Sequence, residues 1–229
     1  MITILDRIPF HIDPLVLADE LRVKEGSSHA VQLRQLASQA EAIARPKALY
    51  GLSFVEAKGK DWVELDDSRF SSRILRVNLK GVHRVFPYVV TCGVELDAWS
   101  NNFDDFLLRY YADVIKEMAL TAAVKALDEH LENQFHPGPL SSMNPGSLGD
   151  WPLEVQPQLF ALLGNVEEMI GVRLTSSYLM LPTKSISGLY FPTDQRFVSC
   201  QLCPRENCPS RRAPYDEHLY ELKYVEQEI

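Results

Sequence analysis

The stretch from residue 141 to residue 191 limits the possible folds of this chain more than any other. It begins with a loop rich in Ser, Pro and Gly, continues as a short apolar segment, and ends in two runs rich in Ser, Tyr and Met. Asp150 before Trp151 and Pro152 predicts a helix start, because a carboxylate accepts the free amide bonds of a first turn and proline is tolerated there. Gly164 predicts the end of that helix. The apolar residues between these signals recur with helical spacing, at Leu153, Leu159, Phe160 and Leu163.

Two strands are expected after this helix, at residues 177–180 and 185–191. In the second run, Ser185 and Ser187 alternate with an apolar residue, and we expect one face to present these two hydroxyls together with the bare backbone of Gly188. Small polar groups and a glycine allow a flat ligand to approach closely. The alternative interpretation is that these are surface serines on an edge strand.

The same stretch carries a series of spaced residues that resembles a known family. They are Leu174, Thr175, Ser177, Tyr178, Met180, Pro182, Ser185, Ile186, Ser187, Gly188, Tyr190 and Phe191. This pattern is similar to the signature L-T-x-S-[YF]-x-M-x-P-x-x-S-[VI]-S-G-x-Y-F in the C-terminal activation domain of cobalamin-dependent methionine synthase. The resemblance implies an α+β fold, in which helices surround an antiparallel sheet. We expect residues 1–229 to form one such domain, with a cysteine-containing tail from about residue 199.

The resemblance also implies a function. The family's domain caps a corrinoid bound on another module and reactivates cobalamin in the cob(II) state, by one-electron reduction coupled to methyl transfer from S-adenosylmethionine. The implied partners are a corrinoid-binding protein or methionine synthase modules and an electron donor protein. No catalytic nucleophile or general acid is expected, since electron transfer needs a suitable distance and potential rather than proton chemistry. The expected contact residues are Pro145, Gly146, Tyr178, Ser185, Ser187, Gly188 and Tyr190. The alternative is a non-catalytic assembly subunit that keeps only the fold.

The chain departs from the family at the residues that hold S-adenosylmethionine. The family's loop reads R-P-A-P-G-Y, and its arginine and tyrosine grip this ligand. Aligned on Pro145 and Gly146, those two positions are Ser142 and Ser147 here, and a further family tyrosine falls near Phe197. A neutral serine cannot form the bidentate ion pair of an arginine. The sequence therefore predicts that S-adenosylmethionine is either not bound or is bound by other residues.

Three of the four cysteines fall within nine residues, as C-x2-C-x4-C. They are Cys200, Cys203 and Cys208, and Cys92 lies far upstream as a possible fourth ligand. Thiolates are soft ligands that hold zinc or an iron–sulfur cluster, although this spacing lacks the second C-x-x-C of a two-pair zinc finger. A cluster would serve as an electron relay and zinc as a structural clasp. The alternatives are redox-active or free thiols and cysteines without a special role.

Charge and hydropathy exclude two classes of partner. The net charge of -8 comes without a basic stripe, which argues against nucleic acid. No apolar run reaches the length of about 18 residues that a membrane span requires. The first residues contain Asp6 and lack the pattern of a secretory signal, so a cytoplasmic location is expected.

The rest of the chain predicts alternating helices and strands. Pro87 is expected to place its strand at a sheet edge or a bulge. Asp113, Lys116, Glu117, Asp128 and Glu129 are expected on a solvated helix face. The predicted elements are an edge strand at 1–10, helices at 14–26 and 27–44, a hairpin with its turn at 58–60, a strand or helix at 73–78, a strand at 85–91, a helix from 94, a long helix at 104–135, and a loop at 136–146.

Overall fold

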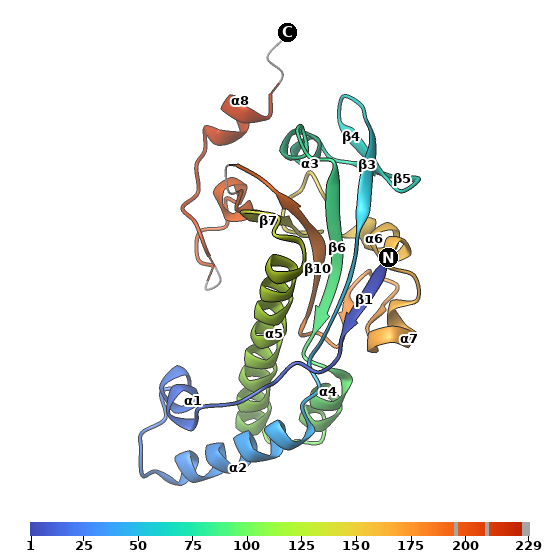
Figure 1. Cartoon of the computed structure of the whole chain (residues 1–229). Coiled ribbons are helices and arrows are strands. Elements are labelled where there is room, and N and C mark those ends of the chain that lie inside the picture. The colour runs from blue at the N-terminus through green and yellow to red at the C-terminus, as the bar shows by residue number, and fades with distance from the viewer. Residues whose placement is uncertain (195–196, 209–210, 226–229) are drawn as a thin grey trace.

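An eight-stranded antiparallel sheet forms the centre of the protein (Figure 1). The computed structural model describes residues 1–194, 197–208 and 211–225. The strands of the main sheet are β1 (Ile2–Leu5), β2 (Lys47–Gly51), β3 (Ser53–Lys58), β4 (Trp62–Leu65), β5 (Ser68–Ser71), β6 (Arg84–Thr91), β7 (Leu140–Met143) and β10 (Ser185–Pro192). Strands β8 (Arg173–Leu174) and β9 (Met180–Leu181) form a separate pair.

Strand β6 is central, so of the two positions expected for Pro87, a sheet edge or a bulge, the sheet edge is wrong. Strand β6 pairs with β2 and β3 on one side and with β10 on the other, and β10 in turn pairs with β7. Strand β2 pairs with residues 88–91, and β3 with Val85 and Arg84. Pro87 therefore lies between these two pairings, where an interruption of the ladder tolerates a residue without an amide donor.

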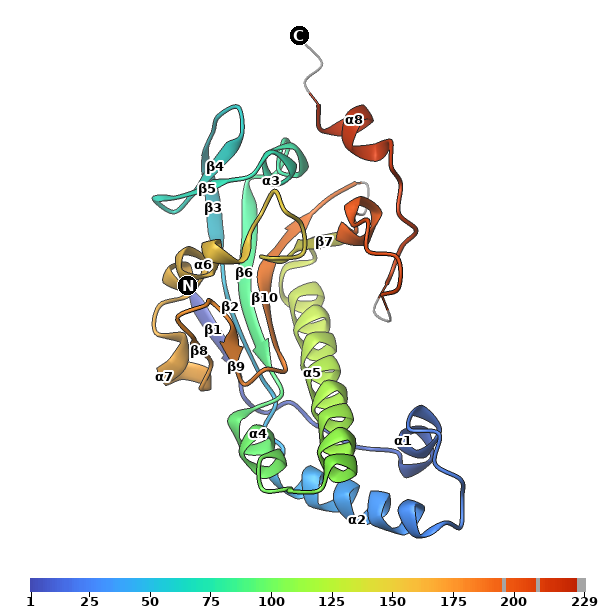
Figure 2. The same ribbon diagram turned by 180° about the vertical axis from the view of Figure 1, so that it is seen from behind.

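Helices cover both faces of this sheet (Figure 2). Because side chains alternate along a strand, neighbouring residues of β6 face opposite layers. Tyr88 packs with the long helix α5, whereas Val89 packs with α6 and α7. The helices are α1 (Pro14–Glu20), α2 (Ser28–Ile43), α3 (Arg73–Asn78), α4 (Val94–Ser100), α5 (Phe106–Phe135), α6 (Gln156–Leu163), α7 (Val166–Ile170) and α8 (Leu219–Lys223), with 3₁₀ turns η1 (Leu153–Val155) and η2 (Ser199–Leu202).

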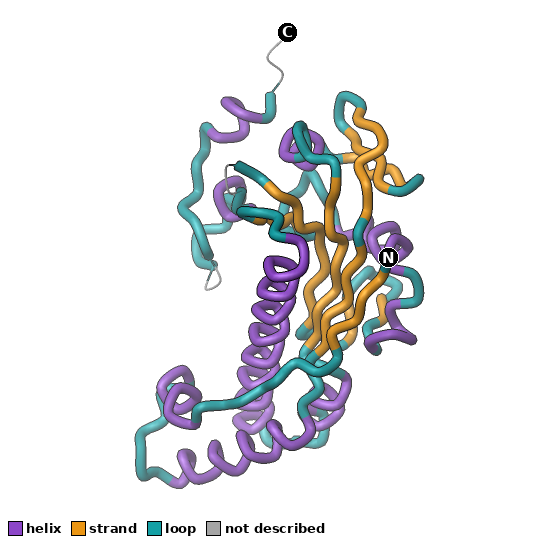
Figure 3. The backbone as a smooth tube through the Cα atoms, in the orientation of Figure 1, coloured by secondary structure: helices purple, strands orange, loops and turns teal. Residues whose placement is uncertain are grey.

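Helices α1, α2 and α4 gather around the first half of α5, beyond the end of the sheet (Figure 3). At three helix starts that the sequence predicted, the side chain of the N-cap residue accepts hydrogen bonds from backbone amides: Asp13, Ser27 and Asp105. These helix starts are confirmed, but α1 ends at Glu20 rather than near Gly26. In the described part of the chain, no helix combines the length and the apolar character that crossing a membrane requires.

Three other predicted elements differ from the structure. The predicted loop 136–146 contains strand β7, because Leu140–Met143 pairs with β10. The undecided segment 73–78 is helix α3. The predicted strand 177–180 is mostly a turn, in which the Tyr178 amide donates to the Thr175 carbonyl at 3.0 Å, and only Met180 of that run pairs.

Asp150 caps a different helix from the one predicted. Its carboxylate accepts hydrogen bonds from the amides of Arg73 at 3.2 Å and Ile74 at 2.9 Å, and from the Ser72 hydroxyl. These are the first residues of α3, whose free amides need acceptors. The segment that follows Asp150 instead begins as η1 and continues as α6.

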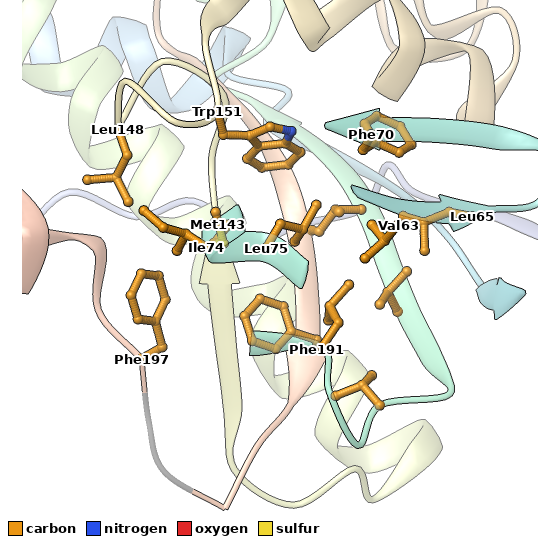
Figure 4. Packing of buried hydrophobic residues seen from close by; sticks show 14 of the residues in the cluster. Val63, Leu65, Phe70, Ile74, Leu75, Met143, Leu148, Trp151, Phe191 and Phe197 are labelled. Carbon is orange, nitrogen blue, oxygen red and sulfur yellow. The ribbon is translucent and has the colours of Figure 1, made fainter. Parts of the chain in front are cut away.

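The C-terminal tail packs onto a hydrophobic core shared with the sheet (Figure 4). Trp151 lies edge-on to Phe70 in this core, with ring centroids 6.4 Å apart. The tail contributes Phe197 and Tyr224, which are 4% and 1% exposed. The Tyr224 hydroxyl also donates to Asn78 Oδ1 at 2.9 Å. The tail is therefore anchored on both the sheet and α3. This arrangement of helices around an antiparallel sheet confirms the predicted α+β fold.

Candidate functional site

A pocket of about 500 Å³ opens between α5, the edge strand β7, β10 and the tail. We call it the Arg212 pocket. Among the described residues, its charged groups are Asp128 and Glu132 from α5 and Arg212 from the tail, and Tyr190 of β10 forms part of its wall. The remaining lining residues are Val124, Gly138, Pro139, Leu140, Ser141, Ser142, Phe197 and Val198. Two carboxylates and one guanidinium in a single pocket suit a ligand that carries both charges.

Two tyrosines stack at the wall of the Arg212 pocket. Tyr190 lines the pocket, and Tyr88 packs against the Tyr190 ring. The rings of Tyr88 and Tyr190 have centroids 4.4 Å apart and planes inclined by 22°. Burial raises the pKa of Tyr88 to about 12, although its hydroxyl accepts a hydrogen bond from Asn144 Nδ2 at 2.7 Å. Burial likewise raises the pKa of Tyr190, and the neighbouring Tyr88 and Asp128 add to the effect. Tyr190 therefore keeps its proton, and its hydroxyl donates a hydrogen bond to the Asp128 carboxylate.

The three residues predicted to share one face of β10 lie on two faces: Ser185 and Ser187 on one, and Gly188 on the other. The Ser185 hydroxyl donates to Thr91 Oγ1 at 2.9 Å, and the Ser187 hydroxyl donates to Gln156 Oε1 at 3.1 Å, toward α6. Gly188 follows Ser187 and therefore lies on the opposite face. The expectation that both hydroxyls and the glycine share one face is wrong, because adjacent residues of a strand point to opposite sides.

The bare backbone of Gly188 is covered by the protein itself. A Cβ atom at this position would lie 2.4 Å from the Met143 carbonyl oxygen, 2.6 Å from Asn144 Nδ2 and 3.0 Å from the Tyr88 hydroxyl. Glycine is required here for the close approach of β7 and the residue that follows it. Contact of Ser185, Ser187 and Gly188 with a ligand stays a prediction, and their side chains or backbone serve internal packing.

The other predicted contact residues lie in two turns. Gly146 has a φ of +80°, and its amide donates to the Trp151 carbonyl at 2.9 Å, next to the buried Pro145. Tyr178 has a φ of +64°, and its carbonyl accepts a hydrogen bond from Gln156 Nε2 at 3.0 Å. Neither turn lines the Arg212 pocket. Of the seven predicted contact residues, Tyr190 alone lies in that pocket as the described residues define it.

The four cysteines are not brought together. Cys92 is fully buried among α2, α4 and α5, where burial raises its pKa to about 12. Cys203 packs instead against the core beside β7 and β10. Within the described residues, no three side chains of His, Cys, Asp or Glu are placed to hold a metal ion. The predicted metal site of Cys92, Cys200, Cys203 and Cys208 stays a prediction that this geometry does not support.

An arginine organises residues 200–208, which we call the cysteine loop. The Arg211 guanidinium donates to the carbonyls of Cys200 at 3.1 Å and Cys203 at 3.2 Å, and also to that of Arg205. Cys200 Sγ accepts a hydrogen bond from the Arg212 amide at 3.4 Å. Partial burial opposes ionisation of the Cys200 thiol, but bonds from backbone amides and from the Arg212 guanidinium outweigh it and lower the pKa of Cys200.

Sequence reasoning missed the charged residues of the Arg212 pocket. It placed Asp128 on a solvated face and did not single out Glu132, although residues four apart share one side of a helix. Another member of that face, Lys116, is only 7% exposed and pairs with Asp97 at 3.2 Å. The sequence does contain one indication of this pocket, because the acids Asp128 and Glu132 are four residues apart and so lie on the same side of α5. The arrival of Arg212 opposite them depends on the path of the tail.

Comparison with known proteins identifies a similar family and a similar fold. Residues 150–209, which are 60 of the 229 residues, match the model of the activation domain of vitamin B12 dependent methionine synthase. A solved structure described as "Crystal Structure of the MetH Reactivation Domain bound to AdoHcy" superposes with a TM-score of 0.63 at 18% identity. That alignment covers 87% of this chain and 81% of the other. A comparison with curated proteins gives no significant match.

The matched segment coincides with a specific part of the fold. It contains α6, α7 and β10, and it includes the whole cysteine loop. The solved structure extends the similarity to most of the chain, at the level of the fold. In sequence over residues 150–209 and in fold over most of its length, this chain resembles the activation domain of vitamin B12-dependent methionine synthase.

Proposed function

We propose that this protein docks onto a corrinoid-binding protein, such as a module of cobalamin-dependent methionine synthase or a related methyltransferase, and takes part in reactivating its corrinoid. The match of residues 150–209 to the activation-domain family carries this proposal. The corrinoid is presented by the partner, and a separate electron donor protein supplies the electron. The role of this chain is then to bind, orient and shield the reacting groups.

The partner is proposed to dock at the mouth of the Arg212 pocket, along the β7 edge of the sheet. A group that passes from a pocket to a bound corrinoid needs the two sites to face each other at short distance. The pocket opens beside β7, and Arg212 at its rim is exposed. This location replaces the predicted contact through Ser185 and Ser187, whose hydroxyls are bonded within the chain.

The Arg212 pocket is proposed to bind a ligand of the S-adenosylmethionine type, since the MetH reactivation domain of similar fold was solved bound to AdoHcy. The residues present fit such a ligand by charge. Arg212 is suited to the ligand carboxylate and takes over the role that Ser142 cannot fill, while Asp128 and Glu132 are suited to its positive groups. When bound, S-adenosylmethionine would supply a methyl group for the partner's corrinoid.

A spectroscopic assay tests this proposal. The chain is mixed with a corrinoid-binding module of methionine synthase in the cob(II) state, a one-electron donor and S-adenosylmethionine, and the visible spectrum is followed. We expect methylcobalamin to form faster than without the chain. The Arg212→Ala variant should abolish most of this gain, and Arg34→Ala, at an exposed position of α2, should retain it.

A pull-down with the same corrinoid-binding module, done beside this assay, separates the alternative of a non-catalytic assembly subunit. Such a subunit would bind the corrinoid module in a pull-down but would not change the rate of methylcobalamin formation at any ligand concentration. Absence of both binding and acceleration would refute the two functions together.

A further inference from the structure

Arg212 takes part in both the Arg212 pocket and the cysteine loop. Its side chain lines the pocket that also contains Tyr190 and Asp128. Its backbone amide donates to Cys200 Sγ at 3.4 Å. The backbone of the pocket's only lining arginine among the described residues is therefore hydrogen-bonded to a cysteine sulfur.

A second thiol lies three residues from Cys200 in a tight turn. Cys200 is part of η2, and the amide of Cys203 donates to the Cys200 carbonyl at 3.3 Å. Side chains three residues apart in a 3₁₀ turn lie on the same side. Both thiols are free and only partly buried. The Arg211 guanidinium holds the two carbonyls of this pair, which keeps the turn closed.

We propose that Cys200 is a positioning residue for Arg212, and that joining Cys200 to Cys203 in a disulfide withdraws Arg212 from the pocket. In a disulfide, the Cys200 sulfur is bonded at about 2.05 Å to another sulfur with a torsion near 90°. The sulfur must turn toward Cys203 to form this bond, and it then no longer lies where it accepts the hydrogen bond of the Arg212 amide. The pocket then loses the positive charge of Arg212, while Asp128 and Glu132 remain. This inference rests on the proposed binding of an S-adenosylmethionine-type ligand.

The oxidant is a small-molecule disulfide, and the exchange is balanced. The Cys200 thiolate attacks one sulfur of oxidised glutathione, which forms a mixed disulfide and releases one glutathione thiolate. The Cys203 thiolate then attacks the Cys200 sulfur, which forms the internal disulfide and releases the second glutathione. Two cysteine thiols are oxidised, one glutathione disulfide is reduced, and the two cysteine protons pass to the released thiolates.

Calorimetric titration with S-adenosylhomocysteine tests the inference on the full chain. The reduced protein is compared with protein treated with oxidised glutathione, in which peptide mapping identifies the Cys200–Cys203 bridge by the loss of two hydrogens. We expect the bridge to weaken binding by roughly tenfold or more, as the loss of a charge-assisted contact would. Dithiothreitol should restore the affinity.

Two variants separate positioning from general damage. Cys208→Ser keeps the Cys200 and Cys203 pair and should respond as the parent protein does. Arg212→Ala should bind weakly in both redox states, because oxidation has no further contact to remove. Near-UV circular dichroism of the bridged protein should retain the signal of the folded core.

Each failure has a distinct meaning. Equal affinity of the reduced and bridged proteins would overturn the inference, as would a mapped bridge that leaves Cys200 out. A further loss of affinity on oxidation of Arg212→Ala would show that the effect does not pass through Arg212, which also overturns it. No binding by the reduced protein would instead refute the proposed ligand.

Discussion

The carboxylate of Asp150 accepts a hydrogen bond from the amide of Ile74 at 2.9 Å, across 76 residues of sequence. The same carboxylate binds the Ser72 hydroxyl and the Arg73 amide. This contact fixes the loop after β7 to the first turn of α3. It places Trp151, the next residue, in the core between these elements. Asp150, which the sequence pattern assigns to the start of the helix that follows it, therefore caps α3, a helix far away in the sequence.

Replacement of Asp150 should cost stability through α3. Asp150→Ala removes the acceptor of two partly buried amides and one hydroxyl, so we expect the free energy of unfolding to fall by about 1 to 3 kcal/mol. Urea unfolding followed by tryptophan fluorescence measures this change. Glu20→Ala, at an exposed position, is the control and should stay within about 0.5 kcal/mol of the parent protein. An equal effect of both substitutions would contradict the assigned role.

Gly188→Ala should be more disruptive than Gly81→Ala. The added methyl group would lie 2.4 Å from the Met143 carbonyl oxygen, which belongs to the neighbouring strand and cannot move alone. We expect a loss of about 2 kcal/mol or more in the free energy of unfolding. Gly81→Ala is a matched control because no atom lies within 4 Å of its added methyl group. Similar unfolding midpoints for the two variants would contradict this expectation and would show that β7 can shift away from Gly188 at little cost in stability.

Arg212→Lys tests the shape of the cation in the pocket. A lysine keeps the charge but lacks the planar fork that binds a carboxylate through two hydrogen bonds. We expect S-adenosylhomocysteine to bind about tenfold more weakly, with little change in thermal stability because Arg212 is exposed. Unchanged affinity in a calorimetric titration would argue against bidentate binding by Arg212.

Alkaline pH should destabilise the protein through Tyr88. Burial raises the pKa of Tyr88 from 10.0 to about 12, so the folded state holds this proton more tightly than the unfolded chain. The resulting stability is present below pH 10 and is lost between pH 10 and pH 12, with a contribution on the order of 1 to 3 kcal/mol. Urea unfolding across this range should show a smaller pH dependence for Tyr88→Phe than for the parent protein. Identical pH profiles would remove Tyr88 as a contributor.

Metal analysis tests the remaining sequence prediction for the cysteines. Iron, zinc and acid-labile sulfide are measured on protein purified without oxygen. If thiolates of the cysteine loop hold a metal, Cys203→Ala should lose it, whereas Cys92→Ala should keep it because Cys92 lies in a separate core. Iron with sulfide would identify a cluster and zinc a structural site. Absence of all three would refute the metal site and leave the thiols available for disulfide exchange.

Local signals in the sequence predicted much of the secondary structure. The caps of α1, α2 and α5 lie next to the turns that they satisfy, and the strand β6 is a dense apolar run. These features depend on residues a few positions apart, which is why pattern and chemistry sufficed. The signature in residues 174–191 likewise sufficed for the resemblance to the activation domain, because it is contiguous in sequence.

The sequence by itself determined the succession of most helices and strands, the α+β class and the family resemblance. The tertiary structure decided which face each residue of β10 presents to which layer, and which amides Asp150 satisfies. It also decided that Asp128, Tyr190 and Arg212 line one pocket, and that Cys92 lies apart from the cysteine loop. These are contacts between distant segments, and the packing of the whole chain fixes them, whereas periodicity and capping act only between near neighbours.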